Sequence, residues 1–367
     1  MMWPDVDATR QLLGTLALPL EAVLTFGVGS SEVRKYREPA MDRLVVGKRV
    51  VVHDRPLADA LREPVLQHRL RHDHLVPVIT VADVFDMSVE PPARLPDAVE
   101  IITPYYPRGS VYDALTHGES FDVVEAMDVA RAAALGLAEL HRQGIVHRDV
   151  KSPNIFLTDD RHVARVGDLG EAHELDDRRR APGIDSPVPW IAPEQVASGL
   201  ATPLSDLYGL GVVLVEMLRG GLDLHGFDRG AAHRRMCRGQ GAMPRRSLAP
   251  PPWTPPEMRR LIRRLTEPDL TRRQPQSASE VADLLARSPA VGWYRVRDEP
   301  PRWEGGSRRT GTRVAIDTRY LPRKTMWELQ LARETASGWT TFRRLRSAQL
   351  DDSTLGAAFD AALTRAG

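Results

Sequence analysis

The sequence is poor in cysteine, in long apolar runs and in net charge. Its 367 residues include one cysteine, Cys237, so no disulfide can form within the chain. This fits a protein of a reducing compartment, and we expect Cys237 to be an ordinary packing residue. The longest strongly apolar stretch, Gly209–Leu218, is about half as long as the ~20 residues that a transmembrane helix needs.

Residues 1–22 contain acidic side chains where a secretory signal needs basic ones, and Pro19 and Glu21 interrupt their apolar run. We therefore expect a cytoplasmic protein without a membrane segment. The net charge is +1, so no overall field favours nucleic acid or membrane surfaces. Apolar residues make up 42% of the chain and charged residues 27%, a balance typical of a soluble globular protein.

Lysine is also scarce. Only four of the 50 basic residues are lysines, namely Lys35, Lys48, Lys151 and Lys324. The chain uses arginine wherever a generic positive charge suffices. Because the rigid guanidinium fork and the compact ammonium group do not substitute freely at a phosphate contact, the remaining lysines are candidates for specific sites.

Hydrophobic patterns divide the chain into a strand-rich part followed by a helical part. Residues 22–52 alternate apolar and polar side chains around glycines, which predicts short antiparallel strands. Residues 55–70 have helical spacing that Pro64 interrupts, and strand-like runs follow at 76–85 and 98–106. From about residue 122 the spacing is helical. This order predicts an α+β protein with two lobes.

The character changes again after residue 289. Strand-like runs at 292–298, 313–321, 326–335 and 340–346 precede a helical run at 354–366, so we place a small β–α domain at 290–367. Arginines alternate with aromatic residues there, which would suit a nucleic-acid surface. The aromatics could instead form the core of a two-layer β–α module, and we favour that interpretation.

The octapeptide HRDVKSPN, His147–Asn154, contains residue types that phosphoryl transfer requires. The carboxylate of Asp149 can accept a hydroxyl proton, and Lys151 can steady the transferred phosphoryl group. The amide of Asn154 can hold a metal ion. Taken alone, the octapeptide could also be a polar surface turn.

Three further motifs follow at spacings that favour the catalytic interpretation. Asp168 lies in VGDLGEA between an apolar run and a glycine, which suits a second metal ligand on a tight turn. WIAPEQ contains Glu194, for which Arg273 of EPDLTRRQP is a candidate buried partner. Asp206 opens the apolar run that ends in GLGVVLVEML.

With these motifs in order, residues 22–288 resemble a eukaryotic-type serine/threonine protein kinase. The abundance of arginine over lysine suggests a bacterial member from a GC-rich source. The resemblance implies the bilobal kinase fold, with an N-lobe at 22–103 and a C-lobe at 107–288, after an N-terminal extension at 1–21. It also implies transfer of the γ-phosphate of ATP, with Mg²⁺, to hydroxyl groups of protein substrates.

The same resemblance assigns roles in the C-lobe. Asp149 would be the catalytic base and Lys151 would contact the γ-phosphate, while Asn154 and Asp168 would hold Mg²⁺. Asp206 would brace the catalytic loop. A lysine at position 151 resembles the serine/threonine subgroup more than the tyrosine subgroup.

In the N-lobe, VVGK (Val45–Lys48) resembles the family's VAIK strand, which implies that Lys48 contacts the α- and β-phosphates. Two of the four lysines thus fall where the family needs lysine, which argues for function. Glu63 would be the helix partner of Lys48, although the adjacent Pro64 puts it at a helix start or a kink. Gly27 and Gly29 of FGVGSSEV would form the phosphate-binding loop, in which a third glycine is missing.

The adenine-binding hinge is predicted in EIITPYYPRGS. Thr103 would be the gatekeeper, and the N–H of Tyr106 would face the adenine. Pro104 keeps the carbonyl that this role requires and lacks only the N–H.

The segment between Asp168 and Glu194 contains no threonine and no tyrosine, so Ser186 is its single phosphate acceptor. Kinases with an arginine before the catalytic aspartate, as Arg148 is here, often wait for a phosphate in this segment. Three alternatives stay open. Ser186 is the switch, an aspartate (Asp176, Asp177 or Asp185) replaces the phosphate, or a partner sets the loop.

Two other functions compete with the active kinase. A pseudokinase-like scaffold that binds partner proteins would explain the missing third glycine, Pro64 and Pro187, but not the retention of all the catalytic residues. A small-molecule phosphotransferase would share Asp149 and Asn154 and would have no reason for the APE motif or for Asp206.

Overall fold

The computed structural model describes residues 20–26, 31–51, 62–86, 93–159 and 164–366. The described chain forms two compact units. The first comprises residues up to 107 together with 165–172, and the second comprises 108–164 and 173–367. Nearly all of the predicted extension 1–21 lies outside the described residues, as do Gly27 and Gly29.

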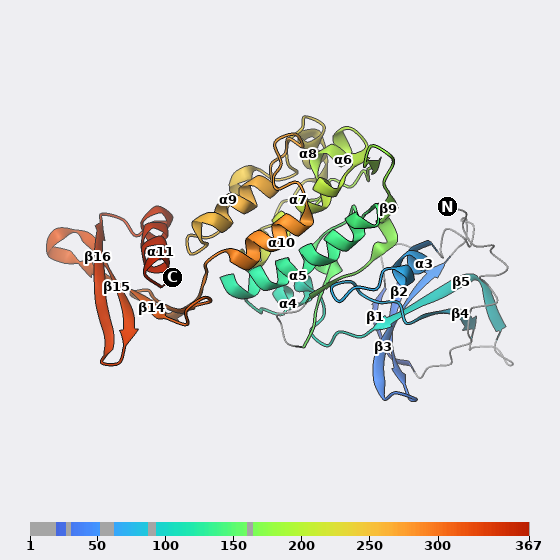
Figure 1. The fold of residues 1–367 in the computed structure, drawn as a ribbon, viewed down its shortest axis with the longest axis horizontal. Coiled ribbons are helices and arrows are strands. Elements are labelled where there is room, and N and C mark those ends of the chain that lie inside the picture. Colours follow the sequence, from blue (N-terminus) through green and yellow to red (C-terminus); the bar gives the residue numbers. More distant parts are fainter. Residues whose placement is uncertain (1–19, 27–30, 52–61, 87–92, 160–163, 367) are drawn as a thin grey trace. The chain divides into compact units, whose positions relative to one another are not determined.

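The first unit contains an antiparallel five-stranded sheet in the order β1-β2-β3-β5-β4 (Figure 1). Its strands are β1 (Leu20–Phe26), β2 (Ser31–Glu38), β3 (Arg43–Val51), β4 (Thr80–Asp86) and β5 (Ala93–Pro104). Tyr36, Val45 and Ile102 form a small core on one face of the sheet. The α+β fold with a strand-rich first part is therefore confirmed.

Helix α3 (Arg62–Arg69) of the first unit falls within the predicted run 55–70, of which residues 55–61 lie outside the described part. Pro64 is the third described residue of α3. That Glu63 lies at a helix start or a kink stays a prediction, because the residues directly before Arg62 lie outside the described part. The side chain of Glu63 lies outside the described residues.

The second unit contains the helical lobe. Its helices are α4 (Val111–Thr116), α5 (Val123–Arg142), α6 (Pro193–Ala197), α7 (Pro203–Arg219), α8 (Arg229–Met236), α9 (Pro256–Leu265) and α10 (Ala278–Arg287). A capping box between Asp122 and Glu125 fixes the start of α5. Helix α7 is buried along nearly its whole length and packs against α5 and α9, while α10 lies beside α5 (Figure 1).

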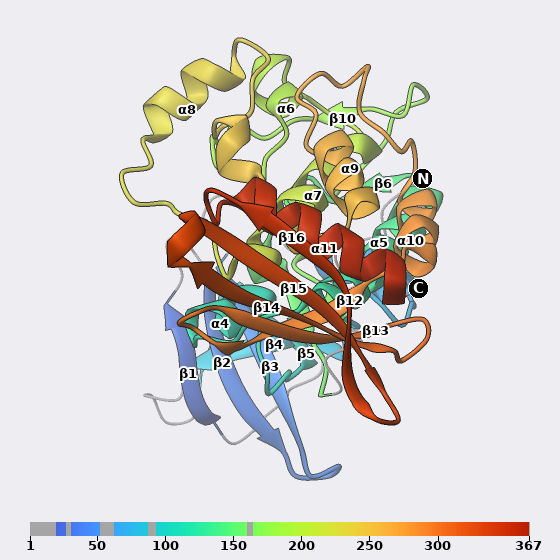
Figure 2. The same cartoon turned by 90° about the vertical axis from the view of Figure 1, so that its left-hand side faces the viewer.

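The C-terminal module, residues 291–366, belongs to the second unit and is an antiparallel meander with one helix. Its elements are β12 (Val291–Arg297), β13 (Arg302–Ser307), β14 (Arg313–Leu321), β15 (Met326–Thr335), β16 (Gly338–Ser347) and α11 (Asp352–Ala366). Helix α11 crosses one face of the sheet (Figure 2) and contacts β13, β14 and β15. Trp293, Trp303 and Phe359 pack edge to face in this core, as the module interpretation predicts.

Two sequence-based expectations need correction. The sequence did not predict strand β13, because the glycines of RWEGGS interrupt the apolar alternation. The structure explains one of these glycines, since a Cβ at Gly305 would lie 2.6 Å from the carbonyl oxygen of Gly292 on the neighbouring strand. Cys237 is exposed and therefore is not a packing residue. In the described residues, no helix is long and apolar enough to cross a membrane.

Candidate active site

Asp206, near the start of α7, anchors the loop that carries HRDVKSPN. Its buried carboxylate accepts hydrogen bonds from the backbone N–H groups of His147, at 2.9 Å, and Arg148, at 2.8 Å. The Nε2 atom of His141, on α5, lies 2.7 Å from the same carboxylate. Charge-assisted bonds in a dry site are strong, so the loop is fixed to the helix behind it. The predicted bracing contact of Asp206 is thus present.

The backbone of this loop is strained where it turns. Arg148 has a φ of 70°, a left-handed conformation that few residues other than glycine adopt. The carbonyl of Arg148 accepts a hydrogen bond from Nε2 of Gln195, at 3.0 Å, so both sides of its peptide are held. Such strain persists where the surroundings impose it and is common at functional sites.

Asp149, Lys151 and Asn154 lie together within the second unit. Oδ2 of Asp149 is 2.7 Å from Nζ of Lys151 and 3.2 Å from Nδ2 of Asn154. Asn154 also donates to the carbonyl of Asp149, at 3.0 Å. The side chain of Asp149 is only 14% exposed, while that of Lys151 is 31% exposed. The carboxylate therefore lies next to a cation at the rim of the loop, an arrangement suited to accepting a proton beside a phosphoryl group.

Close packing of α7 against the loop depends on a glycine. A Cβ at Gly209 would lie 2.4 Å from the carbonyl oxygen of Val150. Any larger residue would push the helix and the catalytic loop apart.

Glu216 is a functional candidate that the sequence reasoning missed. Its buried carboxylate accepts hydrogen bonds from Oγ of Ser152 and Nε1 of Trp190, each at 2.9 Å. Burial raises the pKa of the Glu216 carboxyl above its usual value. Glu216 thus links the catalytic loop to the segment before α6. An isolated acid in the apolar run Gly209–Leu218 was the available signal, because a buried carboxylate needs partners.

Glu194 and Arg273 form the predicted buried pair. Nη1 and Nη2 of Arg273 lie 2.5 and 2.8 Å from the two carboxylate oxygens of Glu194. The side chain of Arg273 is fully buried, and Ser205 donates to the same carboxylate at 2.7 Å. This bidentate pair ties the start of α6 to the segment before α10.

Backbone pairing orders the segment that precedes α6. Strand β9 (His173–Glu174) pairs with β6 (Ile145–Val146), and β10 (Ala181–Pro182) pairs with β11 (Leu200–Ala201). Nη1 of Arg148 donates to the carbonyl of Pro182 at 2.8 Å. The segment therefore has backbone support on both flanks.

One aspartate of this segment also stabilises it locally. Oδ1 of Asp176 accepts from the N–H groups of Arg178, at 2.9 Å, and Arg180, at 2.8 Å, which closes a tight turn. Ser186 is half-buried, and its carbonyl accepts from the N–H of Val188 at 2.8 Å.

The first unit contains the other predicted phosphate-site residues. Nζ of Lys48, on the central strand β3, lies 2.5 Å from Oδ1 of Asp168. Asp168 has a φ of 56° and directly precedes the short 3₁₀ turn η2 (Leu169–Glu171), which packs against α3. A lysine and an aspartate 120 positions apart are thus brought into direct contact.

The predicted hinge residues lie at the end of strand β5, where Thr103 and Pro104 are its last two residues and Tyr106 follows it. Thr103 pairs with Val46 of β3, and the N–H of Tyr105 donates to the carbonyl of Leu44 at 3.3 Å. Burial raises the pKa of the Tyr106 hydroxyl, against the opposing effect of nearby Arg165. The phosphate-loop glycines Gly27 and Gly29 lie outside the described residues.

The two-part fold, the braced HRD-type loop and the buried glutamate–arginine pair define a phosphotransferase scaffold of the kinase class. Consistent with this, the family model described as "Protein kinase domain" matches residues 21–283. The match covers more than half of the chain. The chain therefore belongs to the protein kinase family.

Proposed function

We propose that this kinase is an active serine/threonine protein kinase that transfers the γ-phosphate of ATP, with Mg²⁺, to protein hydroxyl groups. The observation that carries the proposal is the contact of Asp149 with both Lys151 and Asn154, on a loop that Asp206 holds by two backbone hydrogen bonds. A scaffold protein would have no need of this arrangement.

Asp149 acts as the base. Its carboxylate accepts the proton of the substrate hydroxyl as that oxygen bonds to the γ-phosphorus and the bond to ADP breaks. Lys151 balances negative charge next to the same oxygen atoms. Because the backbone of the loop is already fixed, little reorganisation is needed during the reaction.

Asn154 and Asp168 would hold Mg²⁺. Both offer the hard oxygen ligands that this ion prefers, and Mg²⁺ usually takes only one or two protein ligands beside phosphate oxygens and waters. When bound, the ion neutralises charge on the phosphate oxygens. Lys48 would contact the α- and β-phosphates, with Glu63 as its helix partner.

The nucleotide is held at its other end by the hinge. The N–H of Tyr106 would face the adenine, and Thr103 would limit the pocket behind it. Gly27 and Gly29 would let backbone N–H groups approach the phosphates. The protein substrate is a separate partner.

Replacing Lys48 with methionine should lower phosphoryl transfer by about 10²–10³-fold, because the α- and β-phosphates lose a preorganised cation. The matched control is Lys324→Met, an exposed lysine of the C-terminal module, which should leave transfer unchanged. Initial rates with labelled ATP measure both. Equal rates in the two variants would show that Lys48 does not contact the nucleotide.

Ser186→Ala should leave the rate of transfer to a generic protein substrate little changed, because backbone pairing rather than a phosphate supports this segment. The paired strands β9 and β10 and the turn at Asp176 support the segment without a phosphate. A drop above tenfold, together with loss of a phosphopeptide containing Ser186, would instead identify a phosphate switch.

Substrate hydroxyl type is tested by phosphoamino-acid analysis. Myelin basic protein labelled by the kinase should yield phosphoserine and phosphothreonine and no phosphotyrosine. Phosphotyrosine as the main product would refute the serine/threonine assignment while leaving the kinase assignment intact. Absence of any labelled residue, with ATP binding that ignores Mg²⁺, would favour the pseudokinase scaffold.

A further inference from the structure

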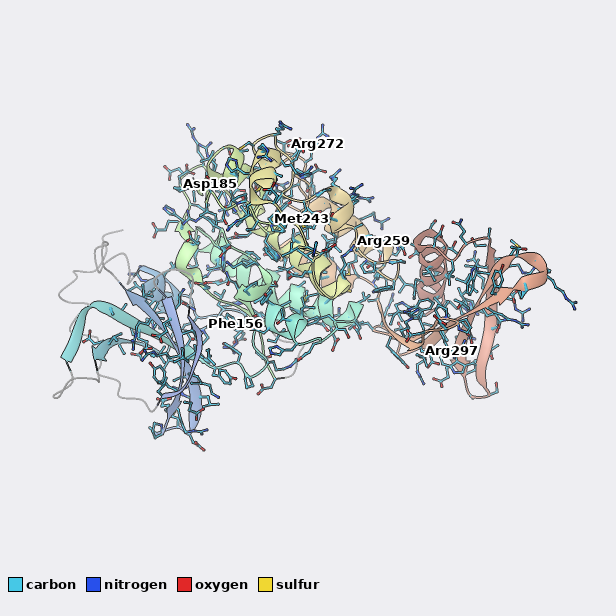
Figure 3. The ribbon with its side chains drawn as sticks, turned by 180° about the vertical axis from the view of Figure 1, so that it is seen from behind. Phe156, Asp185, Met243, Arg259, Arg272 and Arg297 are labelled. Carbon is cyan, nitrogen blue, oxygen red and sulfur yellow. The ribbon has the colours of Figure 1, made fainter. Side chains whose placement is uncertain are left out.

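The C-terminal module is fixed to the helical lobe by polar and aromatic contacts within the second unit. Arg308 pairs with Asp128 of α5 at 2.5 Å, and Arg259 of α9 pairs with Asp360 of α11 at 2.6 Å. Trp253 packs against Phe359 with ring centroids 6.3 Å apart. Figure 3 shows Arg259 where α9 approaches the module. The sheet of the module therefore has a defined position on the lobe that carries Asp149.

The sheet face opposite α11 carries charges that neutralise one another. Arg302 lies 2.6 Å from Asp317 and 2.8 Å from Glu304, and Arg313 lies 3.0 Å from Glu304. The four acids of this face are Glu304, Asp317, Glu328 and Glu334. A polyanion laid over this face would meet carboxylates as well as arginines, so the face does not favour nucleic acid.

The exception is the edge strand β16. It pairs only with β15 and ends the sheet. Arg344 lies opposite Gln330 on the face opposite α11, where its charge helps to lower the pKa of Glu328, whereas Arg343 lies opposite Leu331 on the α11 face. Both are exposed, and neither forms an ion pair with any residue in the described ranges. Pairing of β16 with β15 is regular over Arg343–Ser347 and shifts only before Arg343, at Phe342. We name Arg343–Ser347 the β16 edge.

We propose that the β16 edge binds an extended acidic segment of a protein substrate as an additional antiparallel or parallel strand. That the bound protein is a substrate rests on the kinase function proposed above. A sheet edge presents backbone N–H and C=O groups that a further strand can pair with. Because Arg343 and Arg344 place one exposed guanidinium on each face of this edge, they favour glutamate or aspartate in the added strand. Edge arginines also discourage wrong pairing, and a second copy of β16 would bring like charges together.

The test uses the full-length protein and fluorescein-labelled peptides of about ten residues, the length of a long strand. One peptide alternates Glu with Val and Thr, a second replaces each Glu with Lys, and a third is the acidic peptide with alternate backbone amides methylated. Fluorescence anisotropy should show binding of the first peptide only. Equal binding of the methylated peptide would overturn strand addition, because methylation removes the backbone donors.

Arg343→Glu/Arg344→Glu should weaken binding of the acidic peptide about tenfold or more, which corresponds to ~1.4 kcal/mol. The matched control is Arg319→Glu/Arg323→Glu, which reverses two exposed arginines of the same module and should change binding little. If the charge-reversed variant unfolds at a lower temperature than the wild-type protein, the variant Arg343→Gln/Arg344→Gln is used in its place. Equal loss in test and control variants would overturn the proposed location.

Two further outcomes would overturn the proposal in favour of other occupants. Tighter binding of a single-stranded oligonucleotide than of the acidic peptide, lost in Arg343→Glu/Arg344→Glu, would identify a nucleic-acid site. A dimer in sedimentation that the same variant dissociates would identify a second copy as the occupant. Peptide binding is measured without ATP and so does not depend on kinase activity. The variant Arg343→Glu/Arg344→Glu should phosphorylate myelin basic protein at the wild-type rate. Failure of this proposal can therefore be distinguished from failure of the kinase assignment.

Discussion

Replacing Asp149 with asparagine should lower the turnover number for phosphoryl transfer by about 10²–10⁴-fold, the range for removal of a general base. Asparagine has the same shape as aspartate and can still accept from Lys151 and Asn154, which contact Oδ2 in the wild-type protein. It cannot take up the hydroxyl proton. The affinity for ATP should therefore stay within a few-fold, and the loss should appear in turnover.

The matched control for this variant is Asp159→Asn, an exposed aspartate that follows the short strand β7 (Ile155–Leu157). It should transfer phosphate at the wild-type rate. Steady-state kinetics give turnover, and titration calorimetry gives nucleotide affinity. A turnover in Asp149→Asn within tenfold of the control would show that Asp149 is not the base.

Replacing Arg273 with leucine should destabilise the second unit by about 3–5 kcal/mol, the cost of removing one partner of a buried ion pair. The guanidinium is fully buried, makes two bonds to Glu194 and also donates to the carbonyl of Leu204 at 3.0 Å. Without it, the carboxylate of Glu194 would be left nearly buried, with Ser205 as its remaining donor. Thermal unfolding followed by circular dichroism measures the change.

The neighbouring Arg272 provides the matched control, because its side chain is 79% exposed. Figure 3 labels Arg272 at the outer surface of the helical lobe. Arg272→Leu should change the free energy of unfolding by no more than about 0.5 kcal/mol. The double variant Arg273→Leu/Glu194→Leu should recover part of the loss, since no charge is then left unpaired. Equal effects of Arg272→Leu and Arg273→Leu would contradict the structural role of the pair.

Much of the fold was predictable because local signals and tertiary packing agree. Helix α5 begins at a capping box at Asp122, and its predicted start at about residue 122 matches the structure. The run Gly209–Leu218 is apolar except for Glu216, and all of its residues are buried in α7. Strand β13 was not predicted because Gly305 allows the backbones of β12 and β13 to approach closely, and this requirement leaves no apolar alternation in the sequence of β13.

The candidate site was predictable to the extent that its residues are near one another in sequence. Asp149, Lys151 and Asn154 fall within one octapeptide, and their contacts follow from that spacing. The links to Glu216 depend on tertiary packing and have no short-range signature. The position of Arg343 and Arg344 on a sheet edge likewise becomes visible only when the strand order is known.

The most direct test of the central claim is transfer of labelled phosphate from γ-labelled ATP to myelin basic protein by the purified full-length chain. The wild-type protein should label the substrate in the presence of Mg²⁺, should stop when EDTA is added, and should resume when Mg²⁺ is restored in excess. The Asp149→Asn preparation should stay at the background under all three conditions. Labelling that survives EDTA, or that is equal in the wild-type and Asp149→Asn proteins, would contradict an active, Mg²⁺-dependent kinase with Asp149 as its base.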